Sequence, residues 1–544
     1  MIVLGLTHPI SWNNAACILM DGQLVAMAEE ERFTRTKHAP RTPPAQAMHF
    51  CLQAAGVTLR EVDYVAIGFD SAARAAMGNL SLSHGLSGLN QAAQWFREGR
   101  KHERLLPLDG VDEEKVIFVN HHRSHAASAF FASGFEEATI LSLDGSGGSE
   151  SGILAVGRGT EIEILHRVSN KGSWGLAYEL ITEALGFRRH SGEGKTMGLA
   201  AYGNPDPDGL PFVEWDGIPQ INARGRQEFI ASLVPRSEDA PLTDEHKQLA
   251  ATLQHTLEQA GIQMAQWLYE QTGLRNLCLA GGTALNCSMN GKLALLPFVD
   301  NIFIQPAAHD AGTALGAALL VHTEKTGERP RWEMKHTYWG AEYGNAEIEA
   351  ALQATQDIEY HLSDDVCREA AGLLADGKIV GWFQGRFEVG PRALGNRSIL
   401  ADPSNPDMKD LINMKVKNRE PWRPFAPSVL EEEIGRYISP ALPSPFMIQA
   451  FDVRPEHQRE LVSATHVDNS ARPQTVSRAT NPRYWQLIKN FQERTGIPAV
   501  LNTSFNVRGQ PIVNTPRQAI DTYLKTGMDR LAIGDFIVRR QQEQ

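Results

Sequence analysis

The sequence has no apolar run close to the roughly 20 residues that a helix needs to cross a bilayer. Residues 1–5 enter an apolar segment without a preceding basic region, so no secretory signal is expected. Cysteine is scarce as well, because the chain has five, at positions 17, 51, 278, 287 and 367. Their odd number and wide scatter argue against a disulfide framework and a zinc ribbon. We therefore expect a cytoplasmic protein without a membrane partner.

Basic residues are fewer than acidic ones, with 52 Lys and Arg against 64 Asp and Glu and a formal net charge of −12. This balance argues against general binding to nucleic acid. The hydrophobic content of 42% is ordinary for a globular protein, and no low-complexity tract is present. A chain of 544 residues is too long for one core, so two or three domains are expected.

The N-terminal half contains two signals for β-hairpins. Asp21-Gly22 separates the apolar runs 15–20 and 23–28, which predicts a hairpin. Asp144-Gly145, followed by the apolar run 152–157, gives a second hairpin signal of the same kind. Two halves that each open with a hairpin indicate an internally duplicated α/β domain.

The rest of the chain divides near position 340. Residues 203–243 are rich in Pro, Gly and charge and indicate a loop or insertion. Over 330–362 the pattern becomes irregular, and a second α/β unit follows. We predict domains over 1–340 and 341–544. The other predicted elements are helices over 244–272 and 364–376 and strands over 276–280 and 379–383, and the second unit ends with the run 531–536.

A metal site is one interpretation of the segment that follows the apolar run 116–119. Asn120 is a good N-cap, and a helix that begins there carries His121 and His125 on one face at i and i+4. Two imidazoles at that spacing can hold one metal ion. Asp144 adds a carboxylate where the run 139–143 turns into a glycine loop. The alternative is an ordinary helix with surface histidines and a tight turn.

Asp310 stands at the start of a helix of small residues, 311–316. Close helix packing explains the Ala and Gly content but not a carboxylate in so apolar a setting. Asp310 is therefore either the N-cap of this helix or a further ligand of a metal shared with His121, His125 and Asp144.

Two glycine-rich segments are candidate nucleotide contacts. Gly281-Gly282 follows the strand 276–280 and lets backbone approach a ligand closely, with Asn286 able to bind adenine or ribose. The alternative there is a tight turn from strand to helix. The segment 193–203 contains Gly194-Lys195-Thr196, but position 189 lacks the first glycine of a Walker A motif, which we therefore reject.

A local excess of cations marks the second unit. Between 392 and 423 there are seven Lys or Arg against four Asp or Glu. Lys417 and Arg419 would point the same way from a strand. Such a cluster in an acidic protein indicates a phosphate site, and the alternative is a solvated basic face. Downstream, 501–506 offers hydroxyl and amide groups, including Ser504, to a nucleotide.

Taken together, these motifs resemble the O-carbamoyltransferases, the group of nodulation and antibiotic-tailoring carbamoyltransferases. The resemblance runs over nearly the whole chain. It rests on ordered motifs at 29–33 with Arg35, Lys37 and His38, and at 121–125, 144–148, 193–203, 281–286, 390–400, 423–427 and 501–506.

The resemblance implies an N-terminal domain of the actin-like ATPase superfold, similar to the tRNA threonylcarbamoyl-transfer proteins. It implies a C-terminal domain similar to the YrdC-type synthases, which would convert carbamoyl phosphate and ATP to carbamoyl-adenylate. An Fe²⁺ or other divalent metal in the N-terminal domain would then help to deliver the carbamoyl group to a small-molecule hydroxyl. Mg²⁺ with ATP and a homodimer are left open.

The resemblance also implies roles for individual residues. The metal ligands would be His121, His125, Asp144 and Asp310. The contacts to adenosine would come from Gly281, Gly282 and Asn286. The cations for carbamoyl phosphate would be Arg392, Lys417 and Arg419, and further nucleotide contacts would come from Arg423, Arg472 and Ser504.

One position departs from the family pattern. The family usually has a His-Asp pair before the first hairpin, and this chain has Trp12-Asn13 there. His8 lies four residues earlier, and we hypothesise that it deprotonates the acceptor hydroxyl. The alternative is a turn histidine before Pro9.

Two other functions compete with this one. Carbamoylation or threonylcarbamoylation of tRNA is disfavoured by the negative charge and by the lack of a basic groove-lining run. An actin-like nucleotide-sensing ATPase without group transfer would not need a second anion site. The acceptor alcohol itself is not encoded in any motif.

Overall fold

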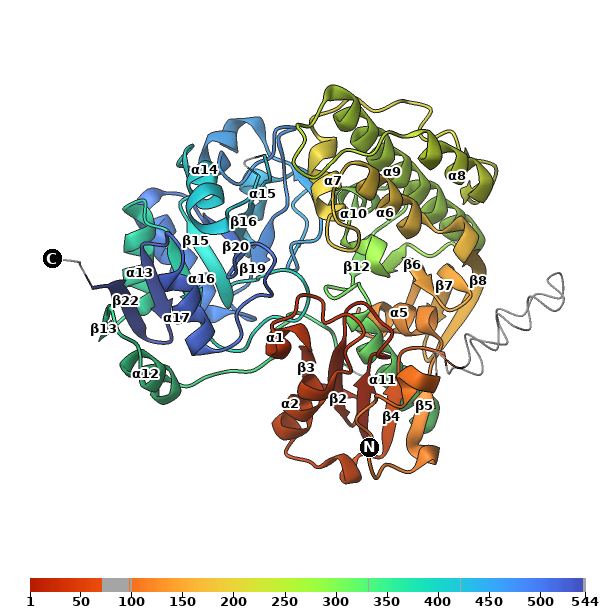
Figure 1. Ribbon diagram of the computed structural model, residues 1–544, viewed down its shortest axis with the longest axis horizontal. Coiled ribbons are helices and arrows are strands. Elements are labelled where there is room, and N and C mark those ends of the chain that lie inside the picture. Colours follow the sequence, from red (N-terminus) through yellow and green to blue (C-terminus); the bar gives the residue numbers. More distant parts are fainter. Residues whose placement is uncertain (71–96, 98–99, 331, 421, 542–544) are drawn as a thin grey trace. The chain divides into compact units, whose positions relative to one another are not determined.

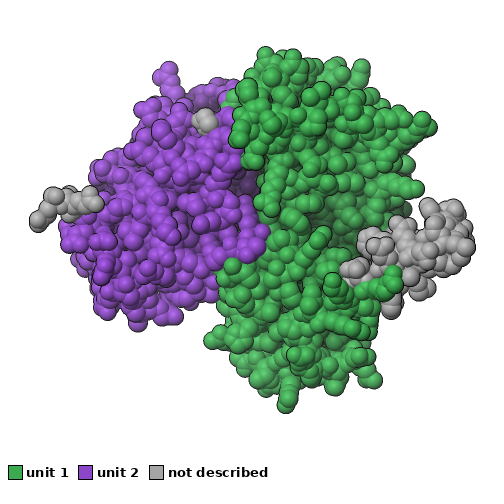
Figure 2. Space-filling view, in the orientation of Figure 1, with its two compact units in different colours: residues 1–34, 38–334 green, residues 35–37, 335–544 purple. Residues whose placement is uncertain are grey.

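The computed structural model describes residues 1–70, 97, 100–330, 332–420 and 422–541. These residues form two compact units (Figure 2). Unit 1 comprises Met1–Thr34 and His38–Met334, and unit 2 comprises Arg35–Lys37 and Lys335–Gln544. All five cysteines lie in described residues, are buried and form no disulfide. Among the described helices, none combines the length and the apolar character that crossing a membrane requires.

Unit 1 contains two five-stranded sheets that share one topology (Figure 1). In each sheet a central strand pairs with an antiparallel hairpin on one side and with two parallel strands on the other. The predicted internal duplication is therefore confirmed. The first sheet has the order β3-β2-β1-β4-β5, with β1 Ile2–Leu6, β2 Ala15–Met20, β3 Gln23–Glu29, β4 Tyr64–Ile67 and β5 Val116–Phe118. The second has the order β8-β7-β6-β11-β12, with β6 Glu137–Gly147, β7 Glu150–Arg158, β8 Glu161–Ser169, β11 Asn276–Ala280 and β12 Asn301–Ile304.

The two expected hairpins differ in where they turn. Asp21 and Gly22 both have positive φ, of 49° and 76°, as a two-residue hairpin turn requires. The second hairpin does not turn at Asp144-Gly145, which corrects the prediction. Strand β6 continues to Gly147, and the register shifts between Leu143 and Gly147. Asp144 therefore lies in an irregular, bulged stretch within β6, where the strand pairing is interrupted.

Two helices cross between the sheets of unit 1. Helix α5, His121–Phe130, follows the first sheet along the chain but packs on β6, β7 and β11 of the second. Helix α11, Ala311–Thr326, follows the second sheet but packs on β1, β2 and β4 of the first. The two helices also pack on each other, and a Cβ added at Gly316 would stand 1.7 Å from the backbone oxygen of Ser124. Close packing therefore explains the small residues of α11.

The long amphipathic helix predicted over 244–272 is α9, Asp244–Thr272. The segment 203–243 is not wholly a loop, because a short strand pair and a helix form within it. These are β9 Val213–Glu214, β10 Gln220–Ile221 and α8 Ala223–Ser232. The side chain of Asn222 caps α8 by accepting a hydrogen bond from Gly225 N at 3.0 Å, a polar signal that the compositional interpretation missed. The other helices of unit 1 are α1 Glu31–Thr34, α2 Ala45–Ala55, α6 Trp174–Ala184, α7 Glu193–Ala200 and α10 Cys287–Ala294.

Unit 2 is built on an eight-stranded mixed sheet with helices on both faces. Val380 and Trp382 of β14 (Val380–Phe383) enter the core under α13 (Val366–Ala375) and α16 (Pro482–Thr495). Phe383 enters the core under α12 (Asn345–Gln353) and α17 (Pro516–Leu524), as strand alternation requires. The helices are α12 Asn345–Gln353, α13 Val366–Ala375, α14 Met408–Ile412, α15 Ile434–Tyr437, α16 Pro482–Thr495 and α17 Pro516–Leu524. The sheet has the order β13-β22-β21-β14-β15-β20-β16-β19, with β13 Ile358–Leu362, β14 Val380–Phe383, β15 Arg397–Ala401, β16 Ala426–Leu430, β19 Gln474–Val476, β20 Ala499–Ser504, β21 Arg530–Ile533 and β22 Phe536–Arg540. Strands β17 Phe451–Asp452 and β18 Ser470–Ala471 form a separate pair.

The run 531–536 contributes to two strands, because Gly534, with φ of 55°, turns the chain between β21 and β22. The irregular stretch 330–362 already contains α12 and β13, whose polar residues hid their periodicity.

Replacement of Gly316 by alanine tests the helix crossing. Gly316→Ala is expected to lower the thermal unfolding midpoint, because overpacking at a rigid backbone contact costs about 1–3 kcal/mol. Gly194→Ala in α7 is the matched control, since its new carbon meets no heavy atom within 4 Å. Its higher helix propensity should leave stability unchanged or raise it by up to about 1 kcal/mol. A Gly316→Ala protein as stable as the wild type would contradict the close crossing.

Candidate metal centre and anion-binding cluster

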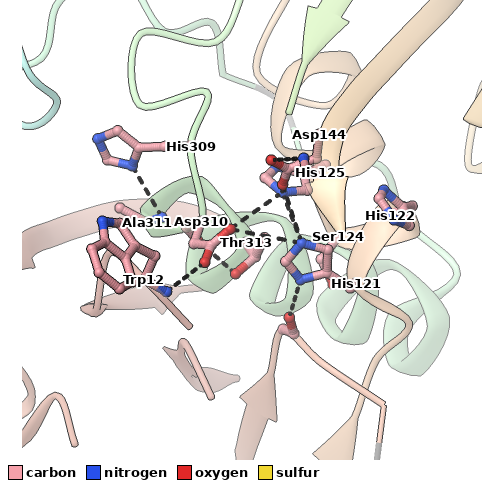
Figure 3. Close-up of polar contacts among 12 residues, drawn as sticks. Trp12, His121, His122, Ser124, His125, Asp144, His309, Asp310, Ala311 and Thr313 are labelled. Atoms are coloured by element: carbon pink, nitrogen blue, oxygen red, sulfur yellow. Dashed lines mark hydrogen bonds and ion pairs between the residues drawn. The ribbon is translucent and has the colours of Figure 1, made fainter. Parts of the chain in front are cut away.

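Four side chains from three segments of unit 1 converge on one point (Figure 3). His121 and His125 come from the first turns of α5, Asp144 from the bulge of β6, and Asp310 from the residue before α11. One ligand atom from each lies within 4.8 Å of the others. The structure thus brings together the whole predicted ligand set.

The distances within this group are short. The Nε2 atoms of His121 and His125 are 3.1 Å apart. Asp144 Oδ2 is 3.4 Å from His121 Nε2 and 3.0 Å from His125 Nε2. Asp310 Oδ1 is 3.7 Å and 4.0 Å from the same two nitrogens. Ligands bound tetrahedrally at about 2.1 Å from an ion lie about 3.4 Å apart, so the group fits a single metal ion.

The hydrogen bond at Nδ1 of His121 favours the tautomer that binds metal. His121 Nδ1 is 3.3 Å from the carbonyl oxygen of Gly68, which can only accept, so Nδ1 carries the proton and Nε2 carries the lone pair. The predicted N-cap role of Asn120 is confirmed, because its side chain accepts a hydrogen bond from Arg123 N at 3.0 Å and caps α5. Two imidazoles with two carboxylates suit Fe²⁺, Zn²⁺ or another divalent transition metal.

Burial and neighbouring charges shift the pKa values of these groups. Burial by itself lowers the pKa of His121, but the hydrogen bond to Asp144 and the charges of Asp310 and Asp144 raise it above its ordinary value. The pKa of His125 is lowered, first by burial. Burial alone would raise the pKa of Asp144, but its hydrogen bonds to both histidines hold it well below the usual range. Asp144 is therefore an anion at neutral pH and requires a cationic partner.

Asp310 occupies the N-cap position of α11 but does not cap it, since its side chain makes no capping hydrogen bond. Its Oδ2 instead accepts a hydrogen bond from the backbone N–H of Trp12 at 2.7 Å, while Oδ1 faces the two histidines. The N-cap alternative is thus wrong, and the backbone of Trp12 orients the carboxylate. No sequence pattern pointed to this contact, because 298 residues separate the partners.

His8 is buried, with 2% of its surface exposed. Its Nδ1 accepts from Ile10 N at 3.2 Å, and its ring lies 5.3 Å from that of Phe69. Burial, helped by the charges of His102 and His121, lowers the pKa of His8 to about 3. The contact to Ile10 is that of a turn histidine, and a catalytic role for His8 stays a prediction.

Of the two glycine-rich candidates, the segment 281–286 forms a turn from strand to helix. Gly281 has a φ of 82°, and a Cβ on Gly282 would stand 2.9 Å from Asp144 Oδ1, so both positions favour glycine beside the metal centre. Asn286 caps α10 by accepting from Met289 N at 3.0 Å and exchanges hydrogen bonds with Gln254. The turn is therefore confirmed, and contact with adenosine stays a prediction. Residues 193–200 form helix α7, which follows helix α6 along the chain, whereas a Walker A loop connects a strand to a helix, in agreement with its rejection.

A cluster of cations lies in unit 2. Lys417 is buried, and its Nζ donates to Ser504 O, Asn506 O at 3.0 Å and Asn506 Oδ1 at 2.9 Å. Arg419 Nε donates to Asn413 Oδ1 at 2.6 Å. Lys417 ends a π-helical turn, Asn413–Lys417, which corrects the prediction that Lys417 and Arg419 share a strand face. Such π-turns are frequent at functional sites.

These cations depress one another's pKa values. Burial, followed by the charges of Arg419, Arg423 and Lys37, lowers the pKa of Lys417 well below its ordinary value. Burial and the charge of Arg423 lower the pKa of Arg419 to about 9. The pKa of Arg423 is lowered as well, first by burial, although the charge of Glu420 opposes this shift. Like charges held together in this way cost free energy that a bound anion would recover.

Arg472 belongs to this group, because its charge acts on both Arg419 and Arg423, and Arg508 acts on Arg423. Arg392 stays a predicted contact of carbamoyl phosphate. It lies in the loop before β15, which Glu388 Oε1 holds by accepting from Leu394 N at 2.9 Å. Of the basic segment 415–424, Pro421 lies outside the described residues.

Sequence reasoning missed several of these residues. Asn506, which shares Lys417 with Ser504, and Lys37 lay inside motifs that were recognised but were given no role, and Arg508 carried no signal. Their approach to the cluster depends on the folding of unit 2 and not on spacing along the chain.

Two family models match the chain. Residues 3–213 and 220–319 match the model "Carbamoyltransferase N-terminus", and residues 371–540 match "Carbamoyltransferase C-terminus". Solved structures give weaker likeness. Full-length HypF in a phosphate- and nucleotide-bound form has a TM-score of 0.37 at 13% identity, covering 61% of this chain and 56% of that one. The ROK hexokinase of Thermus thermophilus has a TM-score of 0.30 at 18% identity, covering 59% and 98%.

Relatives of this chain include a nodulation protein and an O-carbamoyltransferase. Nodulation protein NolNO of Sinorhizobium fredii is 41% identical over 99% of this chain and 80% of its own length. The 3'-hydroxymethylcephem-O-carbamoyltransferase of Amycolatopsis lactamdurans is 30% identical over 79% of this chain and 82% of its own length. The metal group and the cation cluster are consistent with these matches. The chain belongs to the carbamoyltransferase family and is a transferase.

Proposed function

We propose that this protein is an ATP-dependent O-carbamoyltransferase that acts in two steps. Unit 2 converts carbamoyl phosphate and ATP to carbamoyl-adenylate, and unit 1 passes the carbamoyl group to a hydroxyl of a small molecule. The observation that carries the proposal is the buried cation cluster around Lys417, which needs an anion, in a chain that also holds a four-ligand metal group.

The cation cluster supports the first step. Carbamoyl phosphate and ATP bring several negative charges, which Lys417, Arg419, Arg423 and Arg472 can neutralise. Charge neutralisation also favours the loss of phosphate and pyrophosphate as the mixed anhydride with AMP forms. We assign Ser504 to the nucleotide because its carbonyl oxygen already fixes Lys417, and Arg392 to carbamoyl phosphate by family resemblance. Mg²⁺ would accompany ATP.

The metal group supports the second step. When bound, Fe²⁺ or another divalent metal would act as a Lewis acid toward the carbamoyl or phosphate oxygens. His121, His125, Asp144 and Asp310 would hold it. The backbone N–H of Trp12 keeps Asp310 in place, and Gly281 and Gly282 leave space beside Asp144 for the adenosine end of the donor.

The proposal gives residues 1–340 the transfer step on an actin-like domain and 341–544 the adenylate-forming step on a YrdC-like domain, inside the cell. A tRNA acceptor is the runner-up, and the net charge of −12 speaks against it. A nucleotide-sensing ATPase without transfer is the other alternative, and the cation cluster speaks against that.

Pyrophosphate release tests the first step. Purified protein with metal, ATP and carbamoyl phosphate is expected to release pyrophosphate, and Lys417→Met should lower the rate at least about 100-fold because a buried charge at the anion site is lost. Lys415→Ala, at an exposed position two residues earlier, is the matched control and should release pyrophosphate at the wild-type rate. An inactive wild type would refute the transferase mechanism, and an active Lys417→Met protein would refute the role of the cluster.

Metal binding tests the second site. After anaerobic equilibration with Fe²⁺, His125→Ala and Asp144→Ala are expected to bind the ion at least about 100-fold more weakly, as measured by elemental analysis. Binding should also weaken as the pH falls, because the ligands must lose their protons. His122→Gln is the control, because Nε2 of that histidine bonds to Glu150 O at 2.9 Å and lies outside the ligand group. Equal loss in all three variants would contradict the assigned ligands.

A further inference from the structure

A histidine–carboxylate pair lies in unit 1 outside the metal group. His190 Nδ1 is 2.9 Å from Glu179 Oε1, and Arg189 donates to Glu179 Oε2 at 3.2 Å. Since the carboxylate accepts, Nδ1 of His190 carries the proton and Nε2 carries the lone pair. Within the described part of the chain, Nε2 of His190 has no hydrogen-bond partner. This is the arrangement of a histidine that can accept a proton.

The backbone of His190 is held in a conformation that non-glycine residues rarely adopt. Its φ is 60°, in the left-handed region, and its N–H donates to Glu193 Oε1 at 2.7 Å. Such strain costs of the order of 1–3 kcal/mol, and it clusters at functional sites. Glu193 and Glu179 thus fix both the backbone and the ring of His190.

The pair adjoins two of the segments that carry metal ligands. The ring of His190 lies 4.3 Å from that of Trp12, whose backbone N–H binds the ligand Asp310. On the other side, Glu179 Oε1 lies 3.3 Å from the Cβ position of Gly145, the residue after the ligand Asp144. The pair therefore lies beside the metal group and not at an unrelated surface.

We infer that His190, oriented by Glu179, is the base that takes the proton from the acceptor hydroxyl, an inference that rests on the proposed function. The hydroxyl oxygen attacks the carbamoyl carbon of carbamoyl-adenylate, and a carbon–oxygen bond forms. The bond between that carbon and the AMP oxygen breaks, and AMP leaves with the electron pair. The hydroxyl proton passes to His190 Nε2, and the Glu179 carboxylate stabilises the imidazolium.

The pair is better suited to this role than His8. The side chain of His190 is 36% exposed and can meet a substrate, whereas His8 is 2% exposed with its Nδ1 bound to Ile10 N. The hydrogen bond to Glu179 raises the pKa of His190 above its ordinary value, and Glu193 acts in the same sense. Burial and the charge of Arg189 oppose this shift but do not outweigh it.

A single-turnover experiment on the metal-loaded enzyme tests the inference. The substrates are ATP and carbamoyl phosphate, with methanol as the alcohol probe, and pyrophosphate, AMP and methyl carbamate are measured. His190→Asn is expected to form pyrophosphate as the wild type does but to release AMP about 100-fold more slowly. Asparagine is chosen because it tolerates positive φ. His361→Asn is the matched control, because His361 forms an exposed pair with Glu369 at 3.0 Å in unit 2.

Each outcome has one meaning. A wild type without pyrophosphate formation overturns the proposed function, whereas normal AMP release by His190→Asn overturns the present inference alone. Loss of AMP release in His8→Ala but not in His190→Asn assigns the base to His8 and overturns it as well. Added imidazole should restore part of the AMP release in His190→Gly, and failure of this rescue indicates a structural role.

The pH dependence gives two readouts, the rate of AMP release by the loaded enzyme and the titration of His190 in metal-free protein. A base must be neutral, so AMP release should fall as the pH drops through the pKa of His190. Glu179→Gln removes the charge that raises this pKa, and the fall should move to lower pH. In metal-free protein labelled with ¹³C-histidine, the resonance absent from His190→Asn should titrate above about 6.5 and move down in Glu179→Gln. An unchanged titration would contradict the pairing.

Discussion

The crossing of α5 and α11 is the contact on which the metal centre depends. Each helix follows one half of the duplicated unit along the chain but packs on the sheet of the other half. Gly316 lets the backbones approach at Ser124, one residue before His125. The first turn of α5 and the residue before α11 then meet beside the bulge of β6. A side chain at Gly316 would separate the segments that supply the ligands.

The two candidate sites have opposite electrostatic needs. In unit 1, the carboxylates of Asp144 and Asp310 and two imidazole lone pairs gather where no fixed cation is part of the ligand group, so a metal ion completes the charge balance. In unit 2, Lys417 and its arginine neighbours lower one another's pKa values, so an anion completes the balance. Each site would thus be stabilised by a ligand of the opposite charge, as the proposed carbamoyl transfer requires.

Short-range patterns in the sequence predicted correctly the elements that short-range interactions determine. The i,i+4 spacing of His121 and His125 after Asn120 and the apolar period of α9 give the same answer in the chain and in the fold. The errors arose where local preference is ambiguous. Asp144-Gly145 has the composition of a hairpin turn but lies in a bulge, and Lys417 lies on a π-turn that alternation of charges cannot distinguish from a strand. Contacts across long separations, such as Trp12 with Asp310, left no pattern.

Position 12 connects the metal centre with the choice of base. Where the carbamoyltransferase pattern has a histidine, this chain has Trp12, whose indole cannot accept a proton. The backbone N–H of Trp12 orients the metal ligand Asp310. The side chain at position 12, in contrast, offers no proton acceptor. The ring of His190 lies 4.3 Å from this indole, tilted against it, and His190 is held by Glu179 and Glu193. On the present proposal the proton acceptor therefore lies in the segment before α7 and not at position 12.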